Sequence, residues 1–84
     1  MILERIDEPV KVRADFQGGV ITPQRFRLRK QSIRIDRVNA RWEDREGQDR
    51  LYYFSVTTSE GDTYEIHLST RNMIWYADRV FLEG

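Results

Sequence analysis

The chain has 84 residues, of which 39% are hydrophobic and 33% charged, and its formal net charge is zero. This length gives one small domain with a single thin core, and it leaves no room for a catalytic cleft between two domains. Four Phe, four Tyr and two Trp, with many Val and Ile, argue against a disordered chain, which is poor in such residues. There is no cysteine, which excludes disulfides and thiolate metal sites.

The amino terminus does not resemble a targeting signal. Charged residues appear at Glu4 and Arg5, where a signal peptide requires an apolar run. No stretch of the chain approaches the roughly 20 apolar residues that a membrane-spanning helix needs. We therefore expect a cytoplasmic protein without a membrane partner.

Alternation of apolar and polar residues with a period of two runs through most of the chain and predicts strands. The first clear run follows Pro9 and ends at Gly18-Gly19, and Pro23 is expected to open the next strand. The face that we expect to be buried carries Val10, Val12, Ala14 and Phe16, and the opposite face carries Lys11, Arg13, Asp15 and Gln17.

A hairpin follows, in which arginines alternate with apolar residues on both strands. We expect a two-residue loop at Lys30-Gln31, because that loop sets the apolar residues of the two strands opposite one another. The predicted cross-strand pairs are Leu28–Ile33 and Phe26–Ile35 on the buried face, and Arg25–Asp36 and Arg27–Arg34 on the exposed face. The alternation continues through Val38, Ala40 and Trp42 in a long, bent strand.

Two further hairpins complete the predicted sheet. A three-residue loop with Gly61 in the left-handed conformation gives the pairs Val56–Tyr64, Phe54–Ile66 and Tyr52–Leu68. A two-residue loop at Arg71-Asn72 gives the pairs Leu68–Trp75 and Ile66–Ala77. A bulge near Asp78 would turn Val80 and Leu82 towards the core.

These patterns predict a single all-β domain over residues 1–84, with its core in residues 9–82. We expect a small antiparallel meander of about six strands, closed into an SH3-like or other small barrel or strongly curled, because an open meander leaves two exposed edges. Trp42 and Trp75 fall on the inward phase of their strands and are predicted to lie in the core. The sequence leaves open whether Ile2, Leu3 and Ile6 form a further strand, a cap under the barrel or a dimer contact.

Spaced aromatic residues give the chain a resemblance to a known family. The pattern comprises Val38-x-x-x-Trp42, Tyr52-Tyr53-Phe54-x-Val56, Gly61-x-x-Tyr64-Glu65-Ile66, Trp75 and Val80, within roughly residues 8 to 82. It resembles a bacterial family of small all-β domains of unknown function. Members of that family are free-standing proteins of about this length or stand at the end of Y-family, translesion-polymerase-like proteins. The resemblance implies this fold and a link to DNA repair only through association with other domains.

The charges are unevenly spread along the chain. Residues 24–45 carry eight basic and three acidic residues, a net charge of +5, whereas residues 46–84 have a net charge of −4. Guanidinium groups in a row suit phosphate, and an outward tyrosine can stack on a base. The candidate nucleic-acid-binding residues are Arg25, Arg27, Arg29, Arg34, Arg37 and Arg41, with Tyr53 as the stacking residue.

A competing interpretation is that these arginines form only a solvated face, paired with acids of the last segment such as Glu65. The overall pI of about 6.6 also counts against nucleic acid, for which a domain pI above about 9 is usual. Sequence does not decide between the two.

His67 is the only histidine, and the predicted register points it outward opposite Tyr53, with Glu65 near Ser55 on the same face. A flat sheet face excludes little water, and the sequence shows no carboxylate that would orient this histidine. We therefore expect no enzyme, no catalytic residue and no cofactor. One histidine with scattered carboxylates also predicts no metal site.

The sequence thus favours a non-enzymatic interaction module, which binds a protein partner or a second copy of itself. The alternative is a nucleic-acid-binding accessory module associated with DNA repair, which uses the basic face of residues 24–45.

Overall fold

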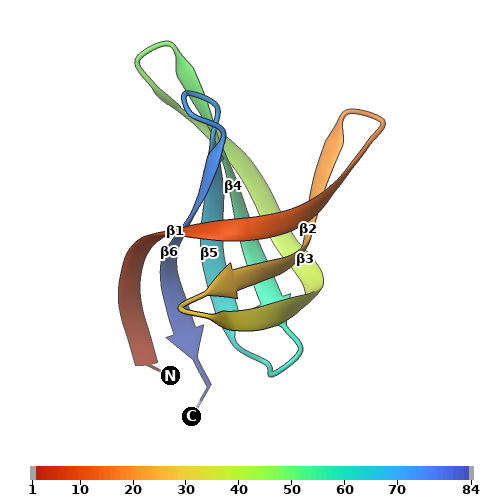
Figure 1. The fold of residues 1–84 in the computed structure, drawn as a ribbon, viewed down its shortest axis with the longest axis vertical. Helices are drawn as coiled ribbons and strands as arrows, with labels where there is room; N and C mark the ends of the chain where they lie inside the picture. The colour runs from red at the N-terminus through yellow and green to blue at the C-terminus, as the bar shows by residue number, and fades with distance from the viewer. Residues whose placement is uncertain (1, 84) are drawn as a thin grey trace.

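The computed structural model describes residues 2–83 and shows six antiparallel strands in a meander that closes into a barrel, with no helix in that range. Figure 1 shows the strands wrapped around a common interior. Their bounds are β1 Ile2–Gln17, β2 Val20–Leu28, β3 Gln31–Glu46, β4 Asp49–Thr58, β5 Thr63–Ser69 and β6 Ile74–Leu82. The predicted all-β meander of six strands is confirmed.

Two long strands close the barrel because each pairs with two neighbours in succession. The first half of β1 pairs with β6 as far as Val10, and its second half pairs with β2 from Lys11 onward. In the same way β3 pairs with β2 as far as Arg34 and with β4 from Ile35 onward. The amino-terminal segment is therefore a strand in the barrel wall, and its Ile6 is buried.

The core lies inside the barrel and contains a residue from every strand. Phe26 packs edge-on against Tyr64, with ring centroids 5.0 Å apart, and the rings of Phe54 and Trp75 lie 5.4 Å apart. Around them are buried aliphatic residues, including Ile6, Val10, Ile35, Val56, Ile66, Leu68, Ala77 and Val80.

The two carboxy-terminal hairpins have the predicted registers. Every predicted apolar pair of β4 with β5 and of β5 with β6 is present, and Gly61 has a positive φ of 91°. In β6 the register shifts so that Asp78 is the extra residue of a bulge, and Val80 beyond it is buried. The bulge works as predicted, because one extra residue reverses the side to which later side chains point.

The predicted register of the β2–β3 hairpin is wrong by two residues. The turn lies at Arg29-Lys30, whose φ values are 50° and 67°, and Phe26 pairs with Ile33 instead of Ile35. Positive φ at both turn residues gives the twist that a two-residue hairpin favours, although residues other than glycine adopt it at a cost. The Arg29 guanidinium is held by Glu8, with nitrogen–oxygen distances of 2.6 and 2.9 Å. Because the error is an even number, the inward and outward faces remain as predicted.

The prediction that Trp42 lies in the core is also wrong. Strand β3 contains two register shifts, and the second leaves Asn39 as an extra residue. Beyond it Arg41 stands opposite the buried Phe54, and Trp42 stands opposite Tyr53 on the outer face, with 41% of its surface exposed. The Asn39 side chain donates to Thr57 Oγ1 at 2.8 Å and so ties the bulge to β4.

The two tryptophans should therefore differ in their contribution to stability. Replacing Trp75 with Ala removes a buried ring and should lower the free energy of unfolding by about 3–5 kcal/mol. Replacing Trp42 with Ala should lower it by only about 1 kcal/mol, because much of this ring already faces solvent. Urea unfolding followed by circular dichroism measures both, and equal losses would contradict the outward position of Trp42.

Candidate interaction surfaces

Five cationic side chains share one outer face and form what we call the basic patch: Lys11, Arg13, Arg25, Arg27 and Arg34. Strand pairing sets them in two rows across the sheet. Arg25 stands between Arg13 of β1 and Arg34 of β3, and Arg27 stands beside Lys11 in the next row. All five side chains are exposed.

Few acidic groups oppose this positive charge. Like charges directly opposite one another destabilise a sheet, so the row of three arginines works against the fold. Within the described residues, Asp36 lies 3.7 Å from Arg34, whereas Arg25 donates only to the Ser32 hydroxyl, at 3.0 Å. Asp15 stands in the row beyond, opposite Thr22.

The acids of the last segment do not neutralise the arginines of residues 24–45. Among the ion pairs of residues 2–83, none joins these two segments. Glu65, the acid suggested by the competing interpretation, instead accepts hydrogen bonds from Arg79 at 2.8 and 3.1 Å. The uneven charge along the sequence is thus also uneven in space.

The predicted arginines do not all reach the patch. Arg29 pairs with Glu8, whose carboxylate raises the pKa of this guanidinium through a hydrogen bond. Arg37 donates to Asn39 at the β3 bulge, and Arg41 reaches across to β2. The patch therefore contains three of the predicted residues, Arg25, Arg27 and Arg34.

The structure adds Lys11 and Arg13 of β1 to the patch. Their outward direction could be predicted from the alternation, but their position beside Arg27 and Arg25 could not. It depends on an extra residue, Gln24, in the β1–β2 ladder, which shifts the partner of Arg13 to Arg25. The Gly18-Gly19 turn, which has positive φ at both residues, was the only signal for this pairing.

Tyr53 lies on a different face, in what we call the aromatic row: Trp42, Tyr53, His67 and Tyr76, one residue from each of β3 to β6. Successive ring centroids are 5.4, 4.8 and 5.1 Å apart, and the Trp42 and Tyr53 rings are parallel to within 7°. Tyr53 therefore lies outside the basic patch, which occupies β1, β2 and the start of β3, and of the predicted arginines it shares the lining of a cleft with Arg41.

Carboxylates surround the aromatic row. Burial is the largest cause of the raised pKa of Tyr53, and the negative charges of Asp78, Asp44 and Glu46 raise it further. His67 Nδ1 lies 2.8 Å from the Asp78 carboxylate, which is within hydrogen-bond distance. An orienting carboxylate is therefore present, contrary to expectation, and the β6 bulge at Asp78 supplies it.

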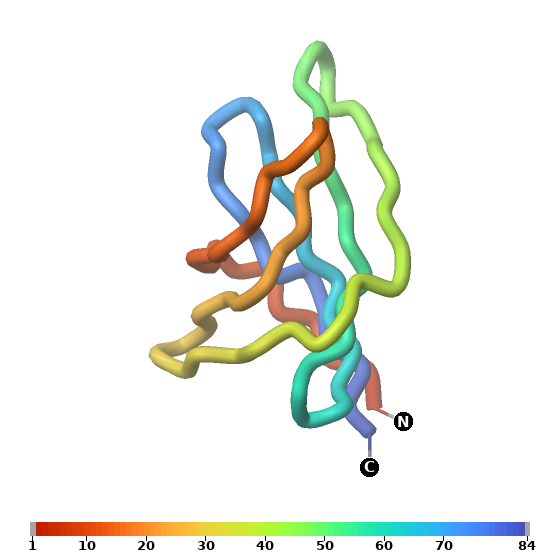
Figure 2. Tube along the Cα trace, turned by 90° about the vertical axis from the view of Figure 1, so that its right-hand side faces the viewer, coloured from red at the N-terminus to blue at the C-terminus, as the bar shows by residue number. Residues whose placement is uncertain are grey.

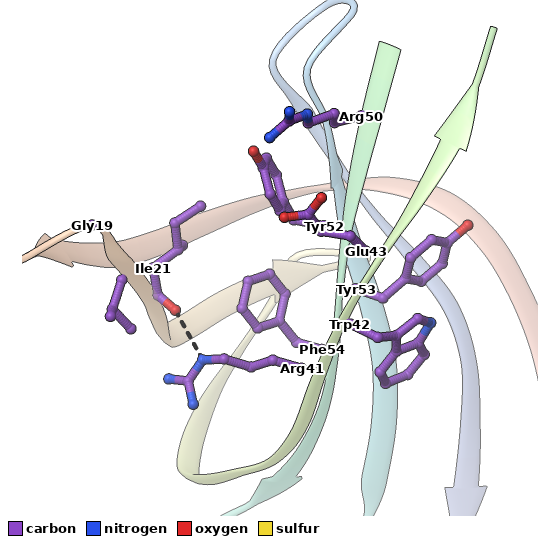
Figure 3. Close-up of a pocket in the computed structure, with 10 residues that line it drawn as sticks. Gly19, Ile21, Arg41, Trp42, Glu43, Arg50, Tyr52, Tyr53 and Phe54 are labelled. Atoms are coloured by element: carbon purple, nitrogen blue, oxygen red, sulfur yellow. Dashed lines mark hydrogen bonds between the residues drawn. The ribbon is translucent and has the colours of Figure 1, made fainter. Parts of the chain in front are cut away.

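An open cleft of about 590 Å³ separates the start of β2 from the second half of β3. Its lining includes Val20, Ile21, Arg41, Tyr52 and Phe54. Figure 3 shows Ile21, Arg41, Tyr52 and Phe54 around the opening. Arg41 spans the cleft and donates to the Ile21 carbonyl at 3.4 Å and to the Thr22 hydroxyl at 3.2 Å.

The cleft is bordered by two strand edges that lack a neighbour. Within the described residues, residues 20–23 of β2 pair only with β1, and residues 37–46 of β3 pair only with β4. Figure 1 shows the outer part of the β1–β2 hairpin pointing away from the β3–β4 hairpin, and Figure 2, turned by 90°, shows that both hairpins extend towards the same end of the barrel. Pro23 is predicted to open its strand but lies inside β2, on the edge that borders the cleft. At an unpaired edge the N–H that proline lacks is not needed for a ladder hydrogen bond.

Residues 2–83 contain no group of three His, Asp or Glu side chains that could hold a metal ion. They also contain no helix long and apolar enough to cross a membrane.

Comparison of the chain with models of known protein families, with curated proteins and with solved structures finds no match. The surfaces are therefore interpreted from their own geometry.

The row of three arginines makes a prediction about stability. Replacing Arg25 with Gln should raise the melting temperature by about 1–5 °C at low salt, because the central one of three neighbouring like charges is removed. The gain should shrink near 1 M salt, where charges are screened over about 3 Å. Arg71→Gln, in the β5–β6 turn, is the control and should change little. A lower melting temperature for Arg25→Gln at low salt would contradict the repulsion.

The acids beside the aromatic row should influence the ionisation of Tyr53. Asp78→Asn should lower the pKa of Tyr53 part of the way towards 10, because burial, the larger cause, remains. The difference in ultraviolet absorbance between each protein and its Tyr53→Phe variant follows this one phenol. Asp62→Asn is the control, since Asp62 raises the pKa of Tyr64 instead. An unchanged Tyr53 titration in Asp78→Asn would contradict the assignment.

The same shifts set the sign of a dependence of stability on pH. The pKa values of Tyr53 and Tyr64 are raised in the folded protein. The two tyrosines therefore make their full contribution to the free energy of unfolding below a pH of about 10, the pKa of tyrosine in the unfolded chain. That contribution is lost as the pH rises through their raised pKa values in the folded protein.

Proposed function

We propose that this protein is a non-enzymatic interaction module that binds an extended segment of a partner protein in the cleft between β2 and β3. The observation that carries the proposal is the pair of unpaired strand edges facing each other across that cleft. An extended peptide can add to such an edge through its main chain, while its side chains reach neighbouring pockets.

The span of Arg41 across the cleft supports an occupant one strand thick. Neighbouring strands lie about 4.8 Å apart, so strands on either side of a missing one are roughly 10 Å apart. Here a long side chain, that of Arg41, crosses from β3 to the Ile21 carbonyl in place of a backbone hydrogen bond. A bound strand would take over that carbonyl and release the guanidinium.

The side chains of the cleft indicate the chemistry of the occupant. Val20 is 48% exposed, and Tyr52 and Phe54 line the floor, so alternate residues of the bound segment should be apolar. Within residues 2–83, Arg41 has a carbonyl and a hydroxyl as acceptors but no carboxylate, whereas Glu43 is the acidic residue of the lining. We therefore expect a carboxylate in the segment to pair with Arg41.

The resemblance to domains at the end of translesion-polymerase-like proteins agrees with this proposal, because an accessory module of a larger assembly needs a site for its neighbours. It does not identify the partner, which the cleft selects by main-chain pairing and by charge.

Selection from a display library of peptides about ten residues long tests the proposal. We expect enriched peptides to alternate apolar residues with an acidic residue, and the Arg41→Glu variant to lose them and select basic ones instead. Arg45→Glu, at the end of the same strand, is the matched control and should keep the wild-type preference. Methylation of the central backbone nitrogens of a bound peptide should abolish binding, because strand addition needs those N–H groups.

Two outcomes would contradict the proposal. One is that no peptide is enriched over the background. The other is that the enriched peptides bind equally well to Arg41→Glu and after backbone methylation, which would place them on another surface. A concentration-dependent dimer in sedimentation velocity that Arg41→Glu dissociates would replace the partner segment with a second copy of the chain.

A further inference from the structure

The basic patch defined above is separate from the β2–β3 cleft, and the strand-binding proposal does not use it. We propose that it is a binding site for nucleic acid, which it holds by the phosphate backbone. The proposal rests on the two rows of cations on β1, β2 and β3 and does not depend on the function of the cleft.

The first argument is the arrangement of the arginines. Arg13, Arg25 and Arg34 are direct cross-strand neighbours, and Lys11 and Arg27 form a second row beside them. Three like charges in a row repel one another and destabilise the fold, so folding does not explain their presence. A ligand with regularly spaced negative charges removes that repulsion when it binds.

The second argument is that the cations remain available. Arg13, Arg27 and Lys11 form no ion pair within the described residues, and Arg25 donates only to a serine hydroxyl. Arg34 has Asp36 at 3.7 Å, at the edge of ion-pair distance, and Asp15 lies one row away. Most guanidinium donors of the patch are thus free to form paired hydrogen bonds with phosphate oxygens.

The third argument concerns which part of a nucleic acid is recognised. The aromatic row lies on β3–β6, beside carboxylates and away from the arginines. The exposed ring that lines a hollow with Lys11, Arg13, Arg25 and Arg27 is Phe16, and stacking of a base on such a ring is tolerant of base sequence. Contacts limited to phosphates carry no sequence information. We therefore expect binding that depends on charge and salt and does not depend on base sequence.

Fluorescence polarisation with labelled duplexes of two unrelated sequences tests the site. Each phosphate neutralised contributes about −0.9 to the slope of log affinity against log salt. Between 50 and 200 mM salt the affinity should then fall about 40-fold for three contacts and about 500-fold for five. The two sequences should bind equally.

The Arg25→Gln/Arg34→Gln variant should make the slope of log affinity against log salt less steep, by the contribution of about two phosphate contacts. Its loss of affinity relative to the wild type should be largest at 50 mM salt. The matched control is Arg45→Gln/Arg71→Gln, which removes the same charge from the β3–β4 and β5–β6 hairpins and should bind like the wild type. Thermal unfolding of each variant shows that a loss of binding does not arise from unfolding.

Three results would overturn the proposal: no binding at 50 mM salt, an equal loss in both double variants, or equally tight binding of polyglutamate of the same charge. The last result would show a surface for acidic protein. Because the Arg41→Glu variant leaves the patch intact, it should bind duplex nearly as the wild type does, so failure at the patch is distinguishable from failure at the cleft.

Discussion

The structure depends on the division of β1 and β3 between two neighbours each. A strand that pairs with one partner along its first half and with another along its second half turns the corner of the barrel, which lets six strands enclose a core. The same division leaves one edge of β2 and one edge of β3 without a partner along part of their length. The start of β2 and the second half of β3 separate after the corner, and the cleft between them is the direct result. Closure of the core and opening of the cleft are thus two consequences of one pairing pattern.

Pairing also determines where the charges lie. The net charge of zero conceals two unlike surfaces: five cations on the outer face of β1–β3, and an aromatic row bordered by acids on β3–β6. Sequence position alone did not produce this, because Lys11 and Arg13 lie outside the basic segment 24–45, whereas Arg29 lies within it but pairs with Glu8 instead of joining the patch. A domain of this size has a thin core and little net stability, so the repulsion within a row of like charges is a considerable fraction of its free energy of unfolding. Such an arrangement is explained more readily by a ligand than by folding.

Much of the fold could be predicted because period-two alternation limits the possible registers. In β4–β6 a shift of one residue would expose Phe54, Ile66 and Ala77 together, so the sequence allowed one register, and the structure has that register. In the β2–β3 hairpin a shift of two residues exposes nothing, and apolar alternation could not separate the two turns. The choice of Arg29-Lys30 depends on backbone twist and on the contact with Glu8 of a distant strand, which no local pattern contains.

The surfaces were harder to predict than the core because bulges create them. The Asn39 bulge moves Trp42 from the predicted interior to the end of the aromatic row and the rim of the cleft, and the Asp78 bulge turns a carboxylate onto His67. A third extra residue, Gln24, aligns Arg13 with Arg25. The Asp78 bulge could be inferred because Val80 needed to be buried. The bulge at Asn39 could not be inferred, because the residues of β3 beyond it are exposed and no buried side chain reports the phase. The bulge at Gln24 lies beside the buried Pro23, whose inward position the alternation did not indicate. The positions with the least hydrophobic signal are therefore the ones that determine the candidate sites.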